Sequence, residues 1–121
     1  RYMVTNETTI VTVPVGYGDG YMRGLTGKAE CLIGGQRYPV VGSLCMDELM
    51  VDVGDANVHV GDEVVLLGRQ VRGDGHMGSI DAVEIAEWAS TIPYEITTTI
   101  SARVPRSFTG RLATEPGVRI P

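Results

Sequence analysis

KAECLIGGQRYPVV, residues 28–41, is the stretch that decides the fold class. Lys28–Ile33 and Gln36–Val41 are two short strand-forming runs, and Gly34 and Gly35 separate them. Both central residues of a type I′ turn need a positive φ, which glycine adopts without steric cost. The sequence therefore predicts a β-hairpin closed by a two-residue turn.

Glycine punctuates the rest of the chain in the same way. It accounts for 16 of the 121 residues, about twice its average share, and it interrupts nearly every apolar run. Pro14 lacks an N–H, so its strand is expected to end, bulge or lie at a sheet edge there. We expect an all-β or β-rich domain, a Greek-key-like β-barrel in which Val71–Gly78 is a loop. The further predicted strands are Thr8–Val15, Leu49–Val53, Glu63–Leu67 and Tyr94–Ile100.

One short α-helix is expected to interrupt this β pattern. Asp81 can cap its N-terminus, and Glu84, three residues later, can complete a capping box. Ile80 and Ile85 have the spacing of a hydrophobic staple. Pro93 is expected to end the helix, because proline cannot donate the helical hydrogen bond.

Composition excludes several classes of protein. The length favours a single domain, and the net charge of −5 argues against a nucleic-acid-binding module. No apolar run approaches the ~18 residues of a transmembrane helix. The first residues, beginning at Arg1, lack the layout of a signal peptide. We therefore expect neither a nucleic acid nor a membrane as a partner.

The cysteines and histidines predict neither a disulfide framework nor a metal site. Cys31 and Cys45 are the only two cysteines, so a reducing, cytoplasmic setting is expected. Together with His59 and His76 they show none of the close spacings of a zinc site.

Two loops could carry chemistry. Gly16–Gly20 could cradle a phosphate, but it lacks the dinucleotide-binding pattern and its Asp19 opposes an anion, so a tight loop needing positive φ is the alternative. Within it, Tyr17 either presents its phenol at a site or packs its ring on the core. Cys45–Asp47 could offer backbone N–H groups to a carboxylate, or form a structural turn held by Asp47.

Five motifs, taken together and in this order, resemble alanine racemase. The resemblance assigns the chain, residues 1–121, to the C-terminal β domain of that family. Residues 1–108 carry it, and residues 109–121 form a polar tail that is expected to be partly disordered. The motifs are VPVGYGDGYMR at 13–23, VGSLCMD at 41–47, SID at 79–81, PYE at 93–95 and SARVPR at 101–106.

The resemblance implies a larger parent enzyme. In this family an N-terminal (β/α)₈ barrel carries the lysine bound to pyridoxal 5′-phosphate, and the C-terminal domain covers the cofactor of the partner subunit in a homodimer. A chain of 121 residues is too short to hold that barrel as well. The implied activity is the interconversion of L- and D-alanine in the cytoplasm, for the supply of cell-wall precursors.

Racemisation needs two bases, one on each face of the α carbon. By resemblance one is the cofactor lysine and the other is a tyrosine just upstream of Arg1, so no catalytic residue is expected within this chain. Tyr2 matches a second aromatic a few positions later and is not that base. We therefore expect the isolated chain to be inactive and not to bind the cofactor tightly.

The resemblance also assigns roles to residues that are present. Met46 matches the residue whose backbone N–H meets the substrate carboxylate, and the adjacent Asp47 is expected to fix that loop. Tyr17 matches the tyrosine of the inner active-site entryway. Arg23 matches a basic residue in the outer part of that corridor, suited to attracting a carboxylate.

Two positions depart from the family pattern. Ala102 stands where some members place a tyrosine on the cofactor phosphate, and Ser43 where an arginine can guard the corridor. These departures bear on cofactor contact and substrate range, so alanine and serine are both open as substrates. The alternative functions are the racemase half of a membrane-anchored serine/alanine racemase and a non-catalytic, racemase-like interaction module.

Overall fold

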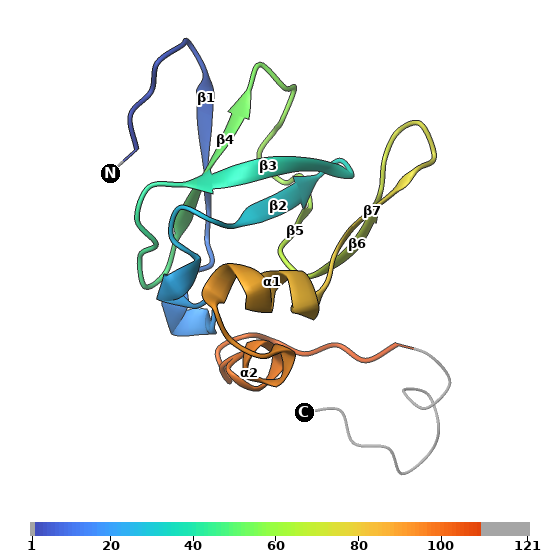
Figure 1. The fold of residues 1–121 in the computed structure, drawn as a ribbon. Helices are drawn as coiled ribbons and strands as arrows, with labels where there is room; N and C mark the ends of the chain where they lie inside the picture. Colours follow the sequence, from blue (N-terminus) through green and yellow to red (C-terminus); the bar gives the residue numbers. More distant parts are fainter. Residues whose placement is uncertain (1, 110–121) are drawn as a thin grey trace.

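The computed structural model describes residues 2–109, which form a β-rich domain with helices at one end (Figure 1). Five antiparallel strands make one sheet in the order β1-β4-β3-β2-β5, and β6 and β7 form a separate ribbon. The strands are β1 (Thr9–Val13), β2 (Glu30–Ile33), β3 (Gln36–Val41), β4 (Leu49–Gly54), β5 (Val64–Val65), β6 (Gly68–Val71) and β7 (Met77–Ile80). The helices are the 3₁₀ turns η1 (Tyr17–Asp19) and η2 (Arg23–Leu25) and the α-helices α1 (Ala82–Ala89) and α2 (Pro93–Thr98).

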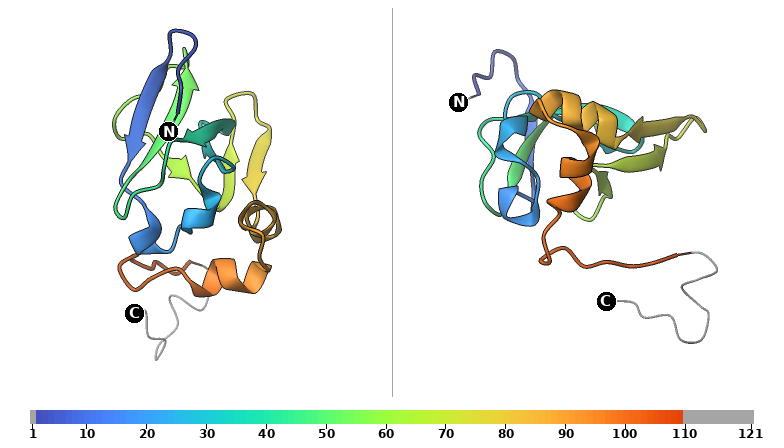
Figure 2. Two further views of the ribbon diagram at one scale, coloured as in Figure 1. Left: turned by 60° about the vertical axis from the view of Figure 1, so that its left-hand side comes forward. Right: turned by 60° about the horizontal axis from the view of Figure 1, so that its bottom comes forward.

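The main sheet has Greek-key connectivity. Strands β2, β3 and β4 are consecutive antiparallel neighbours, and β1 returns to lie beside β4. The sheet curls so that its strands surround part of a barrel, with the helices at one end (Figures 1 and 2). This confirms the predicted β-rich, Greek-key-like class. Strand β1 lies at the sheet edge and ends directly before Pro14, as its missing N–H predicts.

The hairpin predicted from residues 28–41 is confirmed as β2 and β3. Ile33 pairs with Gln36 across the turn. Gly34 and Gly35 have φ values of 61° and 75°, the two positive angles that a type I′ turn requires. The choice of glycine at both positions therefore fixes the register of the pair at the centre of the sheet.

The loop predicted at Val71–Gly78 is confirmed over residues 72–76, but its ends, Val71 and Met77–Gly78, belong to the strands of a second hairpin, β6–β7, that was not predicted. Glycine has low strand propensity, but Gly78 lets the backbone of β7 lie close to the turn of the first hairpin. A Cβ on Gly78 would lie 2.6 Å from the Gly35 carbonyl oxygen. Gln70 Oε1 also accepts a hydrogen bond from the Gly35 N–H at 2.7 Å. The second hairpin is therefore held against the turn of the first.

Helix α1 begins where the sequence predicts. Asp81 is the N-cap, and its Oδ1 accepts from the Glu84 N–H at 2.8 Å. The other half of the capping box is absent, because the Glu84 carboxylate instead accepts two 2.7 Å hydrogen bonds from Arg37 on β3. The helix ends before Pro93, at Ser90, which adopts the left-handed conformation with φ 56°.

The strand predicted at Tyr94–Ile100 is wrong, because this segment forms α2 and an irregular continuation. Pro93 opens the helix, where its fixed φ and missing N–H are tolerated. Hydroxyl groups of the threonine run then bond to carbonyls one turn back, as Thr99 Oγ1 does to Glu95 O at 2.7 Å. The helix buries Ile96 and packs against α1, so tertiary contact overrides the β propensity of threonine.

The core lies between the sheet, the 3₁₀ turns and the helices. Ile80 and Ile85, the predicted staple pair, are both buried in it. Helix α1 packs against η2 as well as α2, which places the helices together at one end of the sheet (Figure 2). The largest fully buried side chains are Leu25, Leu32, Leu49, Ile80, Val51 and Cys31.

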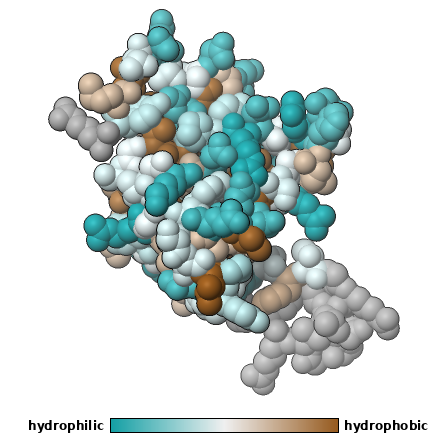
Figure 3. Space-filling model, viewed as in Figure 1, coloured by the Kyte–Doolittle hydropathy of each residue, from teal (hydrophilic) through white to brown (hydrophobic). Residues whose placement is uncertain are grey.

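Apolar surface is scattered over the molecule, and some of it lies over the helices. The space-filling view shows hydrophobic side chains at the lower edge of the domain (Figure 3), and Val83 and Ile92 are more than half exposed. Within residues 2–109, no helix has both the length and the apolar character needed to cross a membrane. The tail predicted from residue 109 onward falls, apart from Thr109, outside the described residues.

We predict that Asp81→Ala lowers the free energy of unfolding by about 1 kcal/mol, because the Glu84 N–H loses its acceptor. Asp81→Asn keeps a capping oxygen and is expected to stay within about 0.5 kcal/mol of the wild type. Urea denaturation followed by circular dichroism measures both variants. An equal loss in the two would contradict the capping role.

Candidate functional site

Three loops distant in sequence meet at one end of the domain. The first holds η1, the second connects β3 to β4, and the third follows α2. Tyr17 N–H donates to Cys45 O at 3.0 Å, and Gly18 N–H donates to Met46 O at 2.8 Å. Ser101 N–H donates to Asp19 O at 3.0 Å. Backbone hydrogen bonds thus bring together the three motifs that contain most of the predicted site residues.

The glycines of the η1 loop make this meeting possible. A Cβ on Gly16 would lie 2.1 Å from Cys45 O, and one on Gly18 would lie 2.1 Å from Arg103 Nη1. Gly20 has φ 104°, and a Cβ there would lie 2.3 Å from Thr99 O. Of the two sequence interpretations, a tight loop fits best, but positive φ explains only Gly20. Close backbone approach explains the other two.

The Met46 peptide lies at the surface of the second loop. The Cys45 N–H donates to Glu48 O at 3.1 Å and closes the turn around it. Among residues 2–109, the Met46 N–H has no hydrogen-bond acceptor, while its carbonyl is held by Gly18. Met46 as a whole residue is 52% exposed. The loop therefore offers a fixed, free N–H donor, which is the arrangement that a carboxylate can use.

Asp47, next in the chain, is held by an arginine that the sequence analysis left without a role. Arg103 Nη2 donates to Asp47 Oδ1, and Arg103 Nε lies 3.5 Å from Asp19 Oδ1. Asp19 Oδ2 in turn accepts from the Gly16 N–H at 3.0 Å. The hydrogen bond to Asp47, followed by the charge of Asp19, raises the pKa of Arg103. Only its place in the SARVPR motif pointed to Arg103.

Tyr17 and Arg23 lie against each other on the first loop and the turn that follows it. The Arg23 guanidinium carbon is 5.6 Å from the centroid of the Tyr17 ring, a cation–π contact. Tyr17 is 42% exposed and does not belong to the core cluster. The ring is therefore available at the surface, beside the loop that carries Met46.

The two positions that depart from the family pattern are both exposed. Ser43 precedes the Cys45–Asp47 turn, and Ala102 precedes Arg103. Tyr2, which was set aside as a catalytic base, does not reach this region. Its hydroxyl donates to Asp52 Oδ2 on β4 at 2.6 Å.

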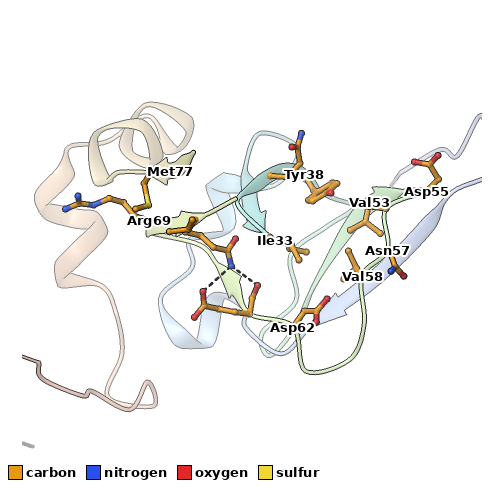
Figure 4. A pocket seen from close by; sticks show the side chains of 15 residues that line it. Ile33, Tyr38, Val53, Asp55, Asn57, Val58, Asp62, Arg69 and Met77 are labelled. Atoms are coloured by element: carbon orange, nitrogen blue, oxygen red, sulfur yellow. Dashed lines mark hydrogen bonds between the residues drawn. The ribbon is translucent and has the colours of Figure 1, made fainter. Parts of the chain in front are cut away.

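A separate hollow lies away from these loops, between the main sheet and the β6–β7 ribbon (Figure 4). Its volume is about 1050 Å³, and its lining includes Tyr38, Asp62 and Arg69 but none of the predicted site residues. The Gln70 amide donates to the Glu63 carbonyl at 3.0 Å and to its carboxylate at 3.1 Å. Over the range 2–109, no cluster of three or more metal-ligating side chains is found.

We predict that Gly16→Ala separates the first two loops and lowers the free energy of unfolding by about 2 kcal/mol. The φ of Gly16 is −149°, so alanine can adopt the backbone, and the clash of its Cβ with the Cys45 and Met46 backbone, 2.1 Å from Cys45 O and 2.5 Å from Met46 O, opposes it. Gly73→Ala is the matched control, because nothing lies within 4 Å of a Cβ there. Chemical denaturation measures both, and a neutral Gly16→Ala would contradict the close contact.

We predict that one thiol of the folded 121-residue chain reacts with a thiol reagent at pH 8. Cys31 is fully buried, and burial, aided by the charge of Glu30, raises its pKa to about 12. It is therefore protonated and shielded from the reagent at pH 8, whereas Cys45 is exposed. Cys45→Ser is expected to remove the fast reaction, and denaturant to reveal Cys31. Two equally fast thiols in the folded chain would contradict this.

Comparison with known proteins places this chain in a family. The model of the alanine racemase C-terminal domain matches residues 1–108. The alanine racemase of Geobacter sulfurreducens is 48% identical over 109 residues, which cover 89% of this chain and 28% of that protein. For the alanine racemase of Cutibacterium acnes the identity is 50% over 113 residues, with coverage of 92% and 29%.

Solved structures agree. Alanine racemase from Bacillus anthracis with bound L-Ala-P matches with a TM-score of 0.80 and 44% identity, over 93% of this chain and 27% of that one. Alanine racemase from Bartonella henselae with covalently bound pyridoxal phosphate matches with a TM-score of 0.72 and 30% identity. This match covers 84% of this chain and 26% of that one. The chain thus spans less than a third of the length of these relatives. Its match over nearly its whole length shows that it belongs to the alanine racemase C-terminal domain family.

Proposed function

We propose that this chain is the substrate-covering part of a pyridoxal-phosphate-dependent alanine racemase that interconverts L- and D-alanine. The observation that carries the proposal is the Met46 N–H, left free on a loop that two backbone hydrogen bonds fix against η1. An amino-acid carboxylate needs oriented donors of this kind. The role rests on the backbone of Met46, so it does not depend on the thioether.

Tyr17 and Arg23 line the approach to that donor. The guanidinium of Arg23 is held over the Tyr17 ring and carries a permanent positive charge at an exposed position. It can attract the carboxylate of a zwitterion, while the ring narrows the passage. Asp47 supports the loop through its bond to Arg103.

In this proposal the described residues do not hold the cofactor by themselves. Lys28 is the single lysine of the sequence, and it lines a hollow with Tyr2 that holds none of the predicted site residues. The cofactor and both catalytic bases therefore belong to the rest of the parent protein in this proposal. When bound there, pyridoxal phosphate takes up the negative charge that develops at the α carbon.

The proposed partners follow from the missing length. A (β/α)₈ barrel of about 250 residues fits the part of the relatives that this chain does not span, since the chain covers 28% of the Geobacter sulfurreducens protein. We propose that the parent is a cytoplasmic homodimer in which this domain closes over the pocket of the partner subunit. This assembly would bring the Met46 loop to a cofactor held by another segment.

The test compares the full-length parent with the isolated chain in the presence of pyridoxal phosphate. We expect the parent to convert L-alanine to D-alanine, measured by circular dichroism or a D-amino-acid oxidase assay, and the isolated chain to show no turnover. A parent without racemase activity would overturn the proposal. Turnover by the isolated chain would overturn the assignment of cofactor and bases to the rest of the protein.

The same assay distinguishes the substrates. The ratio of kcat/KM for alanine to that for serine is measured on the full-length parent, and a ratio above one supports alanine. A preference for serine would replace alanine as the proposed substrate. It would be explained by a wider substrate corridor at the exposed Ser43.

A further inference from the structure

We propose that Arg103 is a positioning residue that holds the Met46 peptide ready for the substrate carboxylate and neutralises the acidic groups around it. This inference rests on the function proposed above. The inference gives Arg103 a role in substrate affinity, although the Arg103 side chain contacts Asp47 and Asp19 and not the substrate itself.

The geometry places Arg103 where all three loops meet. Its guanidinium bonds to the Asp47 carboxylate through Nη2 and lies 3.5 Å from Asp19 through Nε. Its Nη1 lies 2.1 Å from the place where a Cβ of Gly18 would be, so it is seated directly on that glycine. The same hypothetical Cβ would lie 3.0 Å from Met46 Cγ. Gly18 is thus enclosed between Arg103 and Met46.

The Met46 turn has few other restraints. Leu44 N–H donates to Thr26 Oγ1 at 3.4 Å, and the remaining backbone bonds run from η1 or close the turn on itself. The Asp47 side chain is 67% exposed, so without Arg103 it would be free to rotate in solvent. The bonds from η1 hold Cys45 and Met46, and the pair with Arg103 holds the next residue, Asp47.

Charge gives a second reason for the arginine. Asp47 adjoins the donor that would receive an anion, and Asp19 lies on the neighbouring loop. Two carboxylates at this place would repel the carboxylate of a substrate. A single guanidinium between them offsets that repulsion and cannot lose its proton at any working pH. The chain has a net charge of −5, so this local compensation matters for binding an anion.

The test uses the full-length parent and Arg103→Met, which keeps the length of the side chain without its charge. We expect KM for alanine to rise about tenfold, the effect of losing one charge-assisted contact, while kcat changes less than twofold. The inhibition constant of propionate, a carboxylate without an amino group, is expected to rise in parallel. A purely structural role would lower kcat and active-site occupancy without this selective effect on carboxylates.

Arg72→Met is the matched control. Arg72 has the same side-chain exposure as Arg103, 45%, and also pairs with an aspartate, Asp74 at 3.5 Å on the β6–β7 turn. It is expected to leave KM unchanged. Arg103→Lys keeps the charge but cannot bond to both carboxylates at once, so its KM is expected to lie between those of Arg103→Met and the wild type.

Asp47→Asn tests the same bond from its exposed partner, which guards against misfolding of the arginine variant. We expect its KM to rise, and Arg103→Met combined with Asp47→Asn to be no worse than Arg103→Met alone, because both changes remove one interaction. An active wild type whose Arg103→Met and Asp47→Asn variants keep KM and the propionate constant within twofold would overturn the inference. Absence of activity in the wild-type parent would instead overturn the proposed function.

Discussion

The site depends on two backbone hydrogen bonds, from Tyr17 N–H to Cys45 O and from Gly18 N–H to Met46 O. They join a loop that follows the edge strand β1 to a loop that leads into β4, its neighbour in the sheet. Such bonds require close contact between the two backbones, and a side chain on Gly16 would prevent that contact. The carbonyl of Met46 is occupied in this way, and its N–H has no hydrogen-bond acceptor among residues 2–109. The sheet supplies the frame, and the absence of a Cβ permits the contact.

Much of the fold could be predicted from the sequence because its signals are local. The turn at Gly34 and Gly35 and the cap at Asp81 each act within a few residues, and both are confirmed. Helix α2 was missed because its threonines satisfy their hydroxyls on the helix's own carbonyls, a choice that β propensity does not reveal. The β6–β7 hairpin was missed because Gly78 packs against the distant Gly35.

The candidate site shows the same division. Residues alone left Gly16–Gly20 open between a phosphate cradle and a tight loop, because the reason for its glycines lies in loops far along the chain. The family resemblance identified Met46, Tyr17, Arg23 and Asp47, and the structure brings their loops together. Their roles in binding stay predictions. Arg103 had no local signal, since both of its carboxylate partners are distant in sequence.

Helix α2 also sets the angular position of the third loop. It begins at Pro93 and ends at Thr98, and Arg103 follows five residues later on an irregular segment, where the Arg106 guanidinium bonds to the Ile100 carbonyl at 3.1 Å. Each helical residue adds ~1.5 Å of rise and about 100° of rotation. Lengthening or shortening α2 by one residue would swing the guanidinium away from both carboxylates. The number of residues between Pro93 and Arg103 is therefore constrained. We expect the protein to tolerate insertions poorly in this short segment.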